Sequence, residues 1–423
     1  MANNFPKAIT VAFENMLVAF DGAIDIVEHI ETYRMDPVLA ERSNNTFWRP
    51  VPGIARVQDV VIGVPITFQT MNQLSVPTSC DGYFKTASWT MNANELNDPV
   101  QQEREMQSAR DSLASAIHQS IIDVASSNAT VVVPIPAASG NYDDVAACDT
   151  IFTEQGIPMA DRHLALSTRD YSGLASDLAV ASRSFGNAKT DMAYERGVVG
   201  PVSGFTTFKL NYAKRIAAAA GVGVTMNTTL AANVNYVPVA TILTSGQRLN
   251  VDNRTQSVAF NTTAGMAAGD MLTIGGVEAA HHITKTTTGR PKTFRVISIT
   301  NGTVAVISPP IISGGGATDA ELQYKNVVLA STGAAAAVTF LNVNASHINP
   351  FWTRGAIEIC PGRVAVPDSA GADVMRATTR SGIDIVLIRQ YSLQKGETQY
   401  RCDSKWGVNA VDPEKIGALL FNQ

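Results

Sequence analysis

Charged side chains are scarce in this sequence. Asp, Glu, Lys and Arg together make up 16% of the 423 residues, whereas a typical soluble domain holds about 25%. The formal net charge is −5, so the chain lacks the overall basic field that holds nucleic acid by its phosphates. With so few charges and 45% hydrophobic residues, the chain is expected to hide much of its surface, either in its core or against neighbours.

Cysteines and long apolar runs are also few. The four cysteines lie far apart and form no C-x-x-C pair, which favours buried reduced thiols over disulfides. No basic segment followed by an apolar one marks an export signal at the start. The longest apolar run, residues 216–224, is too short to span a bilayer. We therefore expect a protein that folds in a cytoplasm and has no membrane partner. The cysteines are Cys80, Cys148, Cys360 and Cys402.

No catalytic or phosphate-binding signature is present. The sequence has no G-x-x-x-x-G-K-[ST], no G-x-S-x-G and no H-E-x-x-H. The glycine cluster at residues 314–316 has no lysine to reach a phosphate, so a flexible loop is the favoured interpretation. His281 and His282 are adjacent, and adjacent residues on a strand point to opposite faces and chelate poorly. We expect no catalytic residue, no metal and no cofactor, and hence no enzyme.

The chain changes character between residues 227 and 344. Short β-branched runs alternate there with Gly, Asn and Thr, and Asn301-Gly302 is typical of a tight hairpin turn. This pattern predicts a small all-β barrel or sandwich over residues 226–346, inserted into an α+β body. The runs are residues 236–243, 257–260, 294–300 and 303–307.

Helical patterns precede this module. Residues 8–31 place apolar side chains at helical spacing, which predicts an amphipathic helix whose apolar face needs a partner. Asp98-Pro99 supplies an N-cap and a first-position proline for a long helix over residues 99–126. Between these helices, the alternating stretches 57–68 and 83–90 predict a long extended hairpin. After the module, residues 383–391 and 398–402 predict paired strands.

Several short stretches, in the right order along most of the chain, resemble one known family. Residues 42–51 read Arg-Ser-Asn-Asn-Thr-Phe-Trp-Arg-Pro-Val, and residues 249–254 read Leu-Asn-Val-Asp-Asn-Arg. Residues 263–270, 349–352 and 406–410 continue the match as Thr-Ala-Gly-Met-Ala-Ala-Gly-Asp, Asn-Pro-Phe-Trp and Trp-Gly-Val-Asn-Ala. Together they resemble the N-terminal arm, inserted I-domain and closing segment of coat proteins from Lederbergvirus-type short-tailed phages.

The resemblance implies an α+β, Hong Kong 97-type capsid fold with an inserted β-barrel. The elements predicted from the residues fit that plan. The implied division is an N-terminal arm at 1–48, an E-loop hairpin at 49–95, a P-domain spine helix at 96–135, a first A-domain part at 136–225, the I-domain at 226–346, and the A-domain return with P-domain strands at 347–423.

The implied function is that of a major capsid protein. Such a chain assembles with a scaffolding protein into hexamers and pentamers of an icosahedral shell, and the shell matures by expansion. Its further partners are a portal complex and double-stranded DNA, which it encloses without specific binding. It resides in the virion and assembles in the host bacterial cytoplasm. Two alternatives stay open at this point: an encapsulin-like compartment shell protein, and an enzyme with a β-accessory domain.

The resemblance also suggests contact residues. Residues 244–253 correspond to a loop that crosses a twofold axis in the family, and Arg248 and Asp252 are its charges here. Exposed ion pairs contribute only about 0–1 kcal/mol, so no particular salt bridge is predicted. The remaining candidates for contact between subunits are Phe13, Phe20, Trp48, Phe68, Tyr83 and Phe84.

Overall fold

The computed structural model divides the chain into two units that alternate along the sequence. The first holds Met1–Phe47, Thr78–Val124 and Ile357–Asn409, and the second holds Trp48–Pro77, Ala125–Ala356 and Ala410–Gln423. The residues whose placement the structure describes are 7–34, 36, 44–51, 53–55, 57, 59–66, 68–71, 73–80, 83–92, 94–138, 141–185, 199–227, 235–238, 241–242, 248–316, 318–330, 335–366 and 371–423.

A six-stranded sheet forms the centre of the first unit. Its strands are, in order, β1 (Glu31–Thr32), β20 (Ile357–Gly362), β23 (Glu397–Ala410), β22 (Asp384–Ser392) and β21 (Asp373–Thr378), with β4 (Lys85–Asn92) also paired to β23. β22 and β23 are antiparallel, with Tyr391 opposite Thr398. The predicted pair of strands in this region is therefore confirmed.

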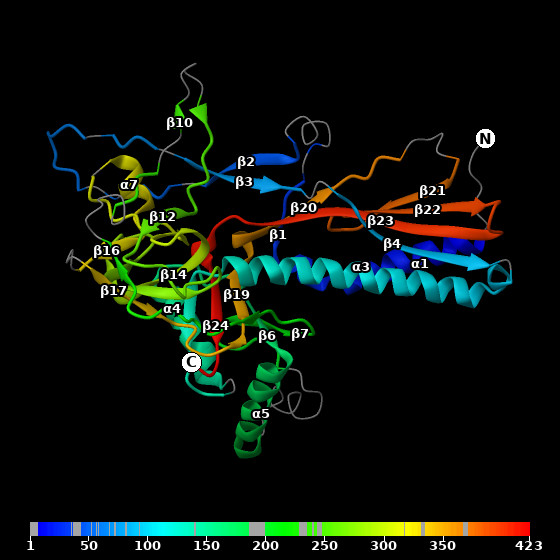
Figure 1. Cartoon of the computed structure of the whole chain (residues 1–423), viewed down its shortest axis with the longest axis horizontal. Coiled ribbons are helices and arrows are strands. Elements are labelled where there is room, and N and C mark those ends of the chain that lie inside the picture. The colour runs from blue at the N-terminus through cyan, green and yellow to red at the C-terminus, as the bar shows by residue number, and fades with distance from the viewer. Residues whose placement is uncertain are drawn as a thin grey trace. The chain divides into compact units, whose positions relative to one another are not determined.

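Two helices belong to the first unit for most of their length. α3 (Pro99–Asn128) begins where the sequence predicts, and the Asp98 carboxylate accepts a hydrogen bond from the Val100 amide at 3.0 Å. α1 (Lys7–Ala23) runs alongside α3 in Figure 1, and His118 of α3 contacts the backbone of Ala23. α1 is shorter than predicted, because the chain passes after Ala23 into a 3-10 helix, η1 (Asp25–His29).

The expected long hairpin is not formed. β4 pairs with β23, whereas β2 (Thr46–Val51) pairs with β3 (Leu74–Ser79) in a separate two-stranded sheet. The described residues between β2 and β3 include no strand, so the predicted pairing of 57–68 with 83–90 is wrong. An alternating pattern yields a strand only where a neighbouring strand satisfies its backbone groups. We call residues 48–77 the arm.

The second unit contains a five-stranded mixed sheet. Its strands are, in order, β5 (Val131–Pro134), β24 (Ile416–Leu420), β19 (Asn349–Thr353), β6 (Arg162–Ser167) and β7 (Phe205–Leu210). All six residues of β6 are buried, including the polar Arg162, His163 and Ser167. Helices α4 (Tyr142–Glu154) and α5 (Thr168–Phe185) follow β5 and β6. Phe152, Phe205 and Phe351 pack in the core with ring centroids 4.8–6.2 Å apart.

The inserted module is a closed β-barrel in the second unit (Figure 1). Its path is β12 (Gln256–Ala259), β15 (Val304–Ser308), β14 (Thr287–Asn301), β13 (Met271–Ala280), β17 (Ala336–Phe340) and β9 (Thr225–Met226), with β16 (Val327–Leu329) also paired to β13. An antiparallel bridge between Met226 and Phe260 joins the two ends of the path. The ring leaves no free edge along this path. The predicted all-β barrel is thus confirmed.

The barrel contains a single core of its own, which includes Val258, Phe260, Leu272, Phe294 and Ile307. The chain enters and leaves the barrel through a two-stranded stalk, in which β8 (Arg215–Ile216) and β18 (Ser346–His347) pair antiparallel. Because both connections are held together, the insertion is joined to the rest of the second unit by a paired ribbon.

Candidate functional site

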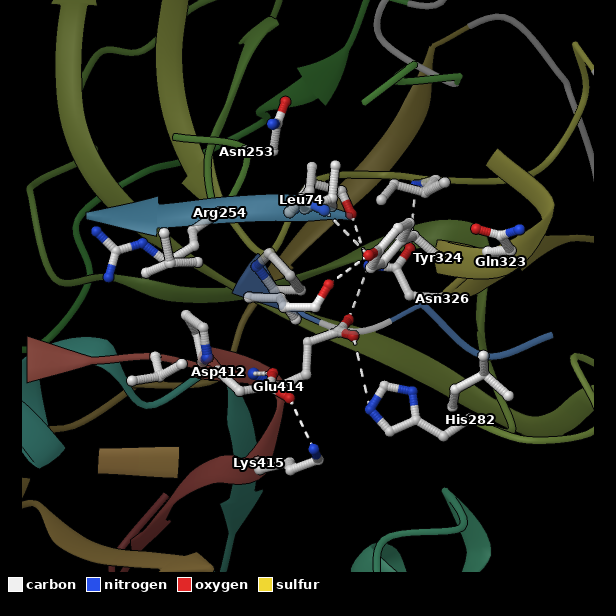
Figure 2. Close-up of a pocket in the computed structure, with 18 of the residues that line it drawn as sticks. Leu74, Asn253, Arg254, His282, Gln323, Tyr324, Asn326, Asp412, Glu414 and Lys415 are labelled. Carbon is white, nitrogen blue, oxygen red and sulfur yellow. Dashed lines mark hydrogen bonds and ion pairs between the residues drawn. The ribbon is translucent and has the colours of Figure 1, made fainter. Parts of the chain in front are cut away.

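One carboxylate fixes the barrel to the body of the second unit. Glu414 lies in the 3-10 helix η5 (Pro413–Lys415), which leads into β24. Lys292 of β14 donates a hydrogen bond to its Oε1 at 2.8 Å, and the Asn326 amide donates to the same oxygen at 2.7 Å. His282 Nε2 lies 3.9 Å from Oε2 (Figure 2). We call these four residues the barrel seat.

The barrel seat holds Glu414 in its ionised form. Burial alone raises the pKa of Glu414, but the positive charge of Lys292 and the surrounding hydrogen bonds outweigh it and bring the pKa to about 2. Burial lowers the pKa of His282, although the Glu414 charge opposes that effect. Glu414 therefore stays ionised through neutral pH, and burial favours the neutral ring of His282.

β14 carries further contacts to the same body. The Thr293 hydroxyl donates to the Thr130 carbonyl at 2.5 Å and accepts from the Val132 amide at 3.3 Å. The Arg295 guanidinium, 5% exposed, donates to the carbonyl of Ser126. Burial lowers the pKa of Arg295 to about 10, opposed by the Asp270 charge. β14 thus makes polar contacts to β5 and to the residues just before it, which orients the barrel against the five-stranded sheet.

A cavity of about 330 Å³ opens beside the barrel seat within the second unit (Figure 2). Its wall combines the arm, the barrel and the segment around Glu414, and most of it is apolar. Lys285 also lines it, and burial lowers the pKa of that amine to about 8. The principal apolar lining residues are Val51, Leu74, Val76, Pro310, Tyr324 and Pro413.

A second hollow of about 680 Å³ lies on the sheet of the first unit. Trp89 of β4 stacks on Tyr400 of β23 there, with ring centroids 5.3 Å apart and planes 5° apart. Arg401 covers the ring of Phe84 at 5.3 Å. The lining of this hollow is therefore mixed: it combines the aromatic side chains of Phe84, Trp89 and Tyr400 with the Arg401 cation and with polar residues.

The arm carries a row of apolar side chains exposed to solvent. Ile62 is 100% exposed and Phe68 is 89% exposed. A monomer that leaves so many large apolar groups in water is unusual, and such patches mark interaction surfaces. The other members of this row are Val57, Val60, Val61, Val64 and Ile66.

The aromatic contact candidates divide into two groups. Phe13 and Phe20 are only 4% and 0% exposed, because they face the core of their own unit, so their proposal as contact residues is corrected. Their helical face is satisfied within the chain instead of by a neighbour. The other four candidates remain exposed at the surface: Trp48, Phe68, Tyr83 and Phe84.

The charged candidates have different surroundings. Arg248 lies in β11 (Arg248–Leu249), which pairs with β10 (Thr241–Ile242). Residues 244–247 of the predicted twofold loop, which spans residues 244–253, fall outside the described residues. Asp252 is engaged within the chain, since the Arg254 guanidinium donates to both of its carboxylate oxygens at 2.9 and 2.7 Å.

The barrel seat is a site that reasoning from the sequence missed. Pro413-Glu414 stands out only as a turn, and the partners Lys292, His282 and Asn326 are 88 or more residues away. No spacing rule links such positions. Within the described part of the chain, no cluster of three His, Cys, Asp or Glu residues is arranged to hold a metal ion. Among the described helices, none is both long and apolar enough to cross a membrane.

A family model matches nearly the whole length of the chain. The profile of a family described as "P22 coat protein - gene protein 5" matches residues 1–422. The chain is also similar to the capsid of cyanophage P-SCSP1u, at 11% identity and a TM-score of 0.43, over 93% of this chain and 85% of that one. It is similar to the I-domain of the phage CUS-3 coat protein, at 32% identity and a TM-score of 0.21, over 28% of this chain and 95% of that one.

The family match supports the sequence-based expectations of fold and function. The α+β element order with an inserted barrel is that of a Hong Kong 97-type coat protein, which confirms the fold class. A coat protein builds the virion by self-assembly into an icosahedral shell and is not an enzyme, so those expectations are confirmed as well. On the strength of a match that spans residues 1–422, this chain belongs to the P22 coat protein family.

Proposed function

We propose that this coat protein assembles on a scaffolding protein into a precursor shell, which expands as double-stranded DNA is packaged through a portal complex. The arm would act as the E-loop, α3 as the spine helix of the P-domain, and the five-stranded sheet as the A-domain centre. The domain boundaries at 48, 95, 135, 225 and 346 are part of this proposal. Assembly would take place in the cytoplasm of the host bacterium.

The observation that carries this proposal is the exposed apolar row of the arm. Burying one Val, Ile or Phe side chain fully is worth about 1.5–3 kcal/mol, and seven such residues lie between Val57 and Phe68. Nothing in the described structure covers Ile62 or Phe68, so an identical neighbour is the natural partner. A shell built from many copies of the same arm contact grows one subunit at a time, and each contact adds only a modest stabilisation. A misplaced subunit can therefore leave before the shell closes.

The charge balance supports a wall that encloses DNA without gripping it. With a formal net charge of −5, the subunit has no general attraction for phosphates. DNA held loosely against the wall is free to rearrange while it is packed. Strong, salt-sensitive binding of DNA by the isolated subunit would contradict this part of the proposal.

The proposal is tested by expressing the chain with and without its scaffolding protein and imaging the products by negative-stain electron microscopy. We expect uniform closed shells only when scaffold is present. Ile62→Ser should abolish shells while leaving the thermal midpoint of the subunit unchanged. Val222→Ser is the matched control, since Val222 is 86% exposed but lies outside the arm. If the Ile62→Ser variant forms shells at the wild-type yield, the proposal is wrong.

A further inference from the structure

A short helix of the inserted segment is held by specific side-chain hydrogen bonds. α7 (Asp319–Tyr324) has six residues, too few to be stable by propensity alone. A capping box holds it: the Glu321 amide donates to Thr318 Oγ1 at 3.3 Å, and the Thr318 amide donates to Glu321 Oε2 at 3.2 Å. Glu321 is 0% exposed. The helix is thus pinned to the barrel and can serve as a rigid anchor.

α7 contacts the arm at two places that lie about 250 residues away in sequence. At the first, the Thr70 amide donates to Asp319 Oδ2 at 2.8 Å, and the Gln323 amide donates to the Thr70 carbonyl at 2.8 Å. The backbone amide and carbonyl of Thr70 are therefore both held by side chains of one helical turn. Such a two-point contact fixes orientation as well as position.

At the second place, one hydroxyl joins both strands of the arm base. Tyr324 Oη accepts a hydrogen bond from the Leu74 amide at 3.1 Å and donates to the Val51 carbonyl at 2.5 Å. Val51 ends β2 and Leu74 begins β3, so this hydroxyl lies where the arm leaves its paired base. Figure 2 shows the Tyr324 ring directed toward Leu74.

The fit around this contact is close. A Cβ added at Gly53 would lie 3.0 Å from Gln323 Oε1 and 3.3 Å from the Tyr324 ring. Any larger residue there would have to displace one of the two side chains that hold the arm. The backbone of the arm therefore approaches α7 at a point where only glycine fits without adjustment.

We propose that Tyr324 and its helix position the arm, so that the inserted barrel sets the direction in which the arm leaves its own subunit. This inference rests on the proposed role of the arm in shell assembly and deepens it. The occupant of the contact is the arm of the same chain, and Tyr324 is a positioning residue: it touches no neighbour but orients the segment that does. An arm held in one direction before assembly loses less conformational freedom on docking.

The arm is held by a few side-chain hydrogen bonds, one of them to the Asp319 carboxylate, which suits a segment that changes partners. Each such bond stabilises the held state only modestly, so the arm remains released for a minor fraction of the time. Removal of the Tyr324 hydroxyl should raise that fraction about five- to tenfold. If the arms of identical subunits point in different directions, neighbouring subunits are joined at different angles. The curvature of the shell then varies from place to place.

The test begins with the isolated subunit, where no neighbour contributes. Tyr324→Phe removes only the hydroxyl. We expect amide exchange of residues 70–76 to become about five- to tenfold faster, while exchange in the barrel strands β12–β15 stays unchanged. Tyr212→Phe is the matched control, because Tyr212 is 42% exposed and lies in the same unit. Unchanged exchange at residues 70–76 would overturn the inference.

The second step is assembly with scaffold. Tyr324→Phe should give closed shells of mixed diameter and some open sheets, whereas wild type and Tyr212→Phe give uniform shells. Faster exchange with uniform shells would overturn the link between arm direction and curvature, while the arm's role in assembly, tested by Ile62→Ser, would stand. If Tyr324→Phe does not fold, Asp319→Ala removes the acceptor for the Thr70 amide and gives the same comparison.

Discussion

The barrel and the arm both carry alternating apolar residues, but the barrel buries these side chains and the arm exposes them. In the barrel, alternating apolar side chains point into a closed ring, and Phe294 and Ile307 are 0% exposed. In the arm, Ile62 and Phe68 are 100% and 89% exposed. The barrel closes its sheet through the Met226–Phe260 bridge, whereas the described residues of the arm between β2 and β3 form no strand. The apolar side chains of the barrel therefore stabilise the subunit, whereas those of the arm are exposed in it and, under the proposed function, become buried on assembly.

The largest loss of subunit stability is expected from a substitution in the barrel core. Phe294→Ala leaves a cavity in the barrel core and should lower the free energy of unfolding by about 3–5 kcal/mol. Chemical denaturation of the purified subunit, followed by circular dichroism, measures this loss. Ile299→Ala is the matched control in the same strand, because Ile299 is 37% exposed and should cost far less. Equal losses for the two variants would contradict the assignment of a barrel core.

The barrel seat should show the next largest effect. Glu414→Gln removes the charge that Lys292 faces, and Lys292 is only 5% exposed. Breaking one partner of a buried pair costs about 3–5 kcal/mol, and the partial exposure of Glu414 reduces this to about 2–3 kcal/mol. Denaturant titration measures the loss. Since neighbouring changes are not additive, Glu414→Gln combined with Lys292→Met should cost less than the two single losses together; full additivity would argue against the pair.

The same pair predicts a pH dependence. The pKa of Glu414 is about 2 in the folded protein, against an ordinary value of 4.5. A carboxyl with a depressed folded pKa contributes stability that is fully present above pH 4.5 and is lost as the pH falls through 2. We expect wild type to lose roughly 2 kcal/mol more than Glu414→Gln between pH 5 and pH 2. Parallel stability curves for the two proteins over that range would contradict this.

Local signals in the sequence predicted the local structure well. Asn301-Gly302 between alternating runs predicted the β14–β15 hairpin, and Asp98-Pro99 predicted the start of α3. Closure of the barrel could not be predicted, because Met226 and Phe260 meet only after all the intervening strands are in place. For the same reason Glu414 was missed, since its partners come from three separated parts of the barrel.

In the arm, the local sequence pattern predicted secondary structure that does not form. Its alternating pattern at residues 57–68 predicted a strand, yet the described residues form none. Alternation of apolar and polar residues indicates which side chains become buried. It does not indicate whether the surface that covers them belongs to the same chain. A segment whose partner lies on another subunit therefore resembles a strand in sequence and an unpaired loop in the isolated subunit.

The smallest effect on stability is the sharpest test of the comparison. Phe68→Ser should change the free energy of unfolding by no more than about 0.5 kcal/mol, because an exposed side chain loses no packing when it is shortened. The same change should greatly reduce shell formation if the proposed function is right, because the arm would then bury this apolar surface between subunits. Phe294→Ala reverses this order, because it weakens the subunit first. A Phe68→Ser subunit that is markedly less stable would mean that the arm is covered by its own chain, and the contrast between the two regions would disappear.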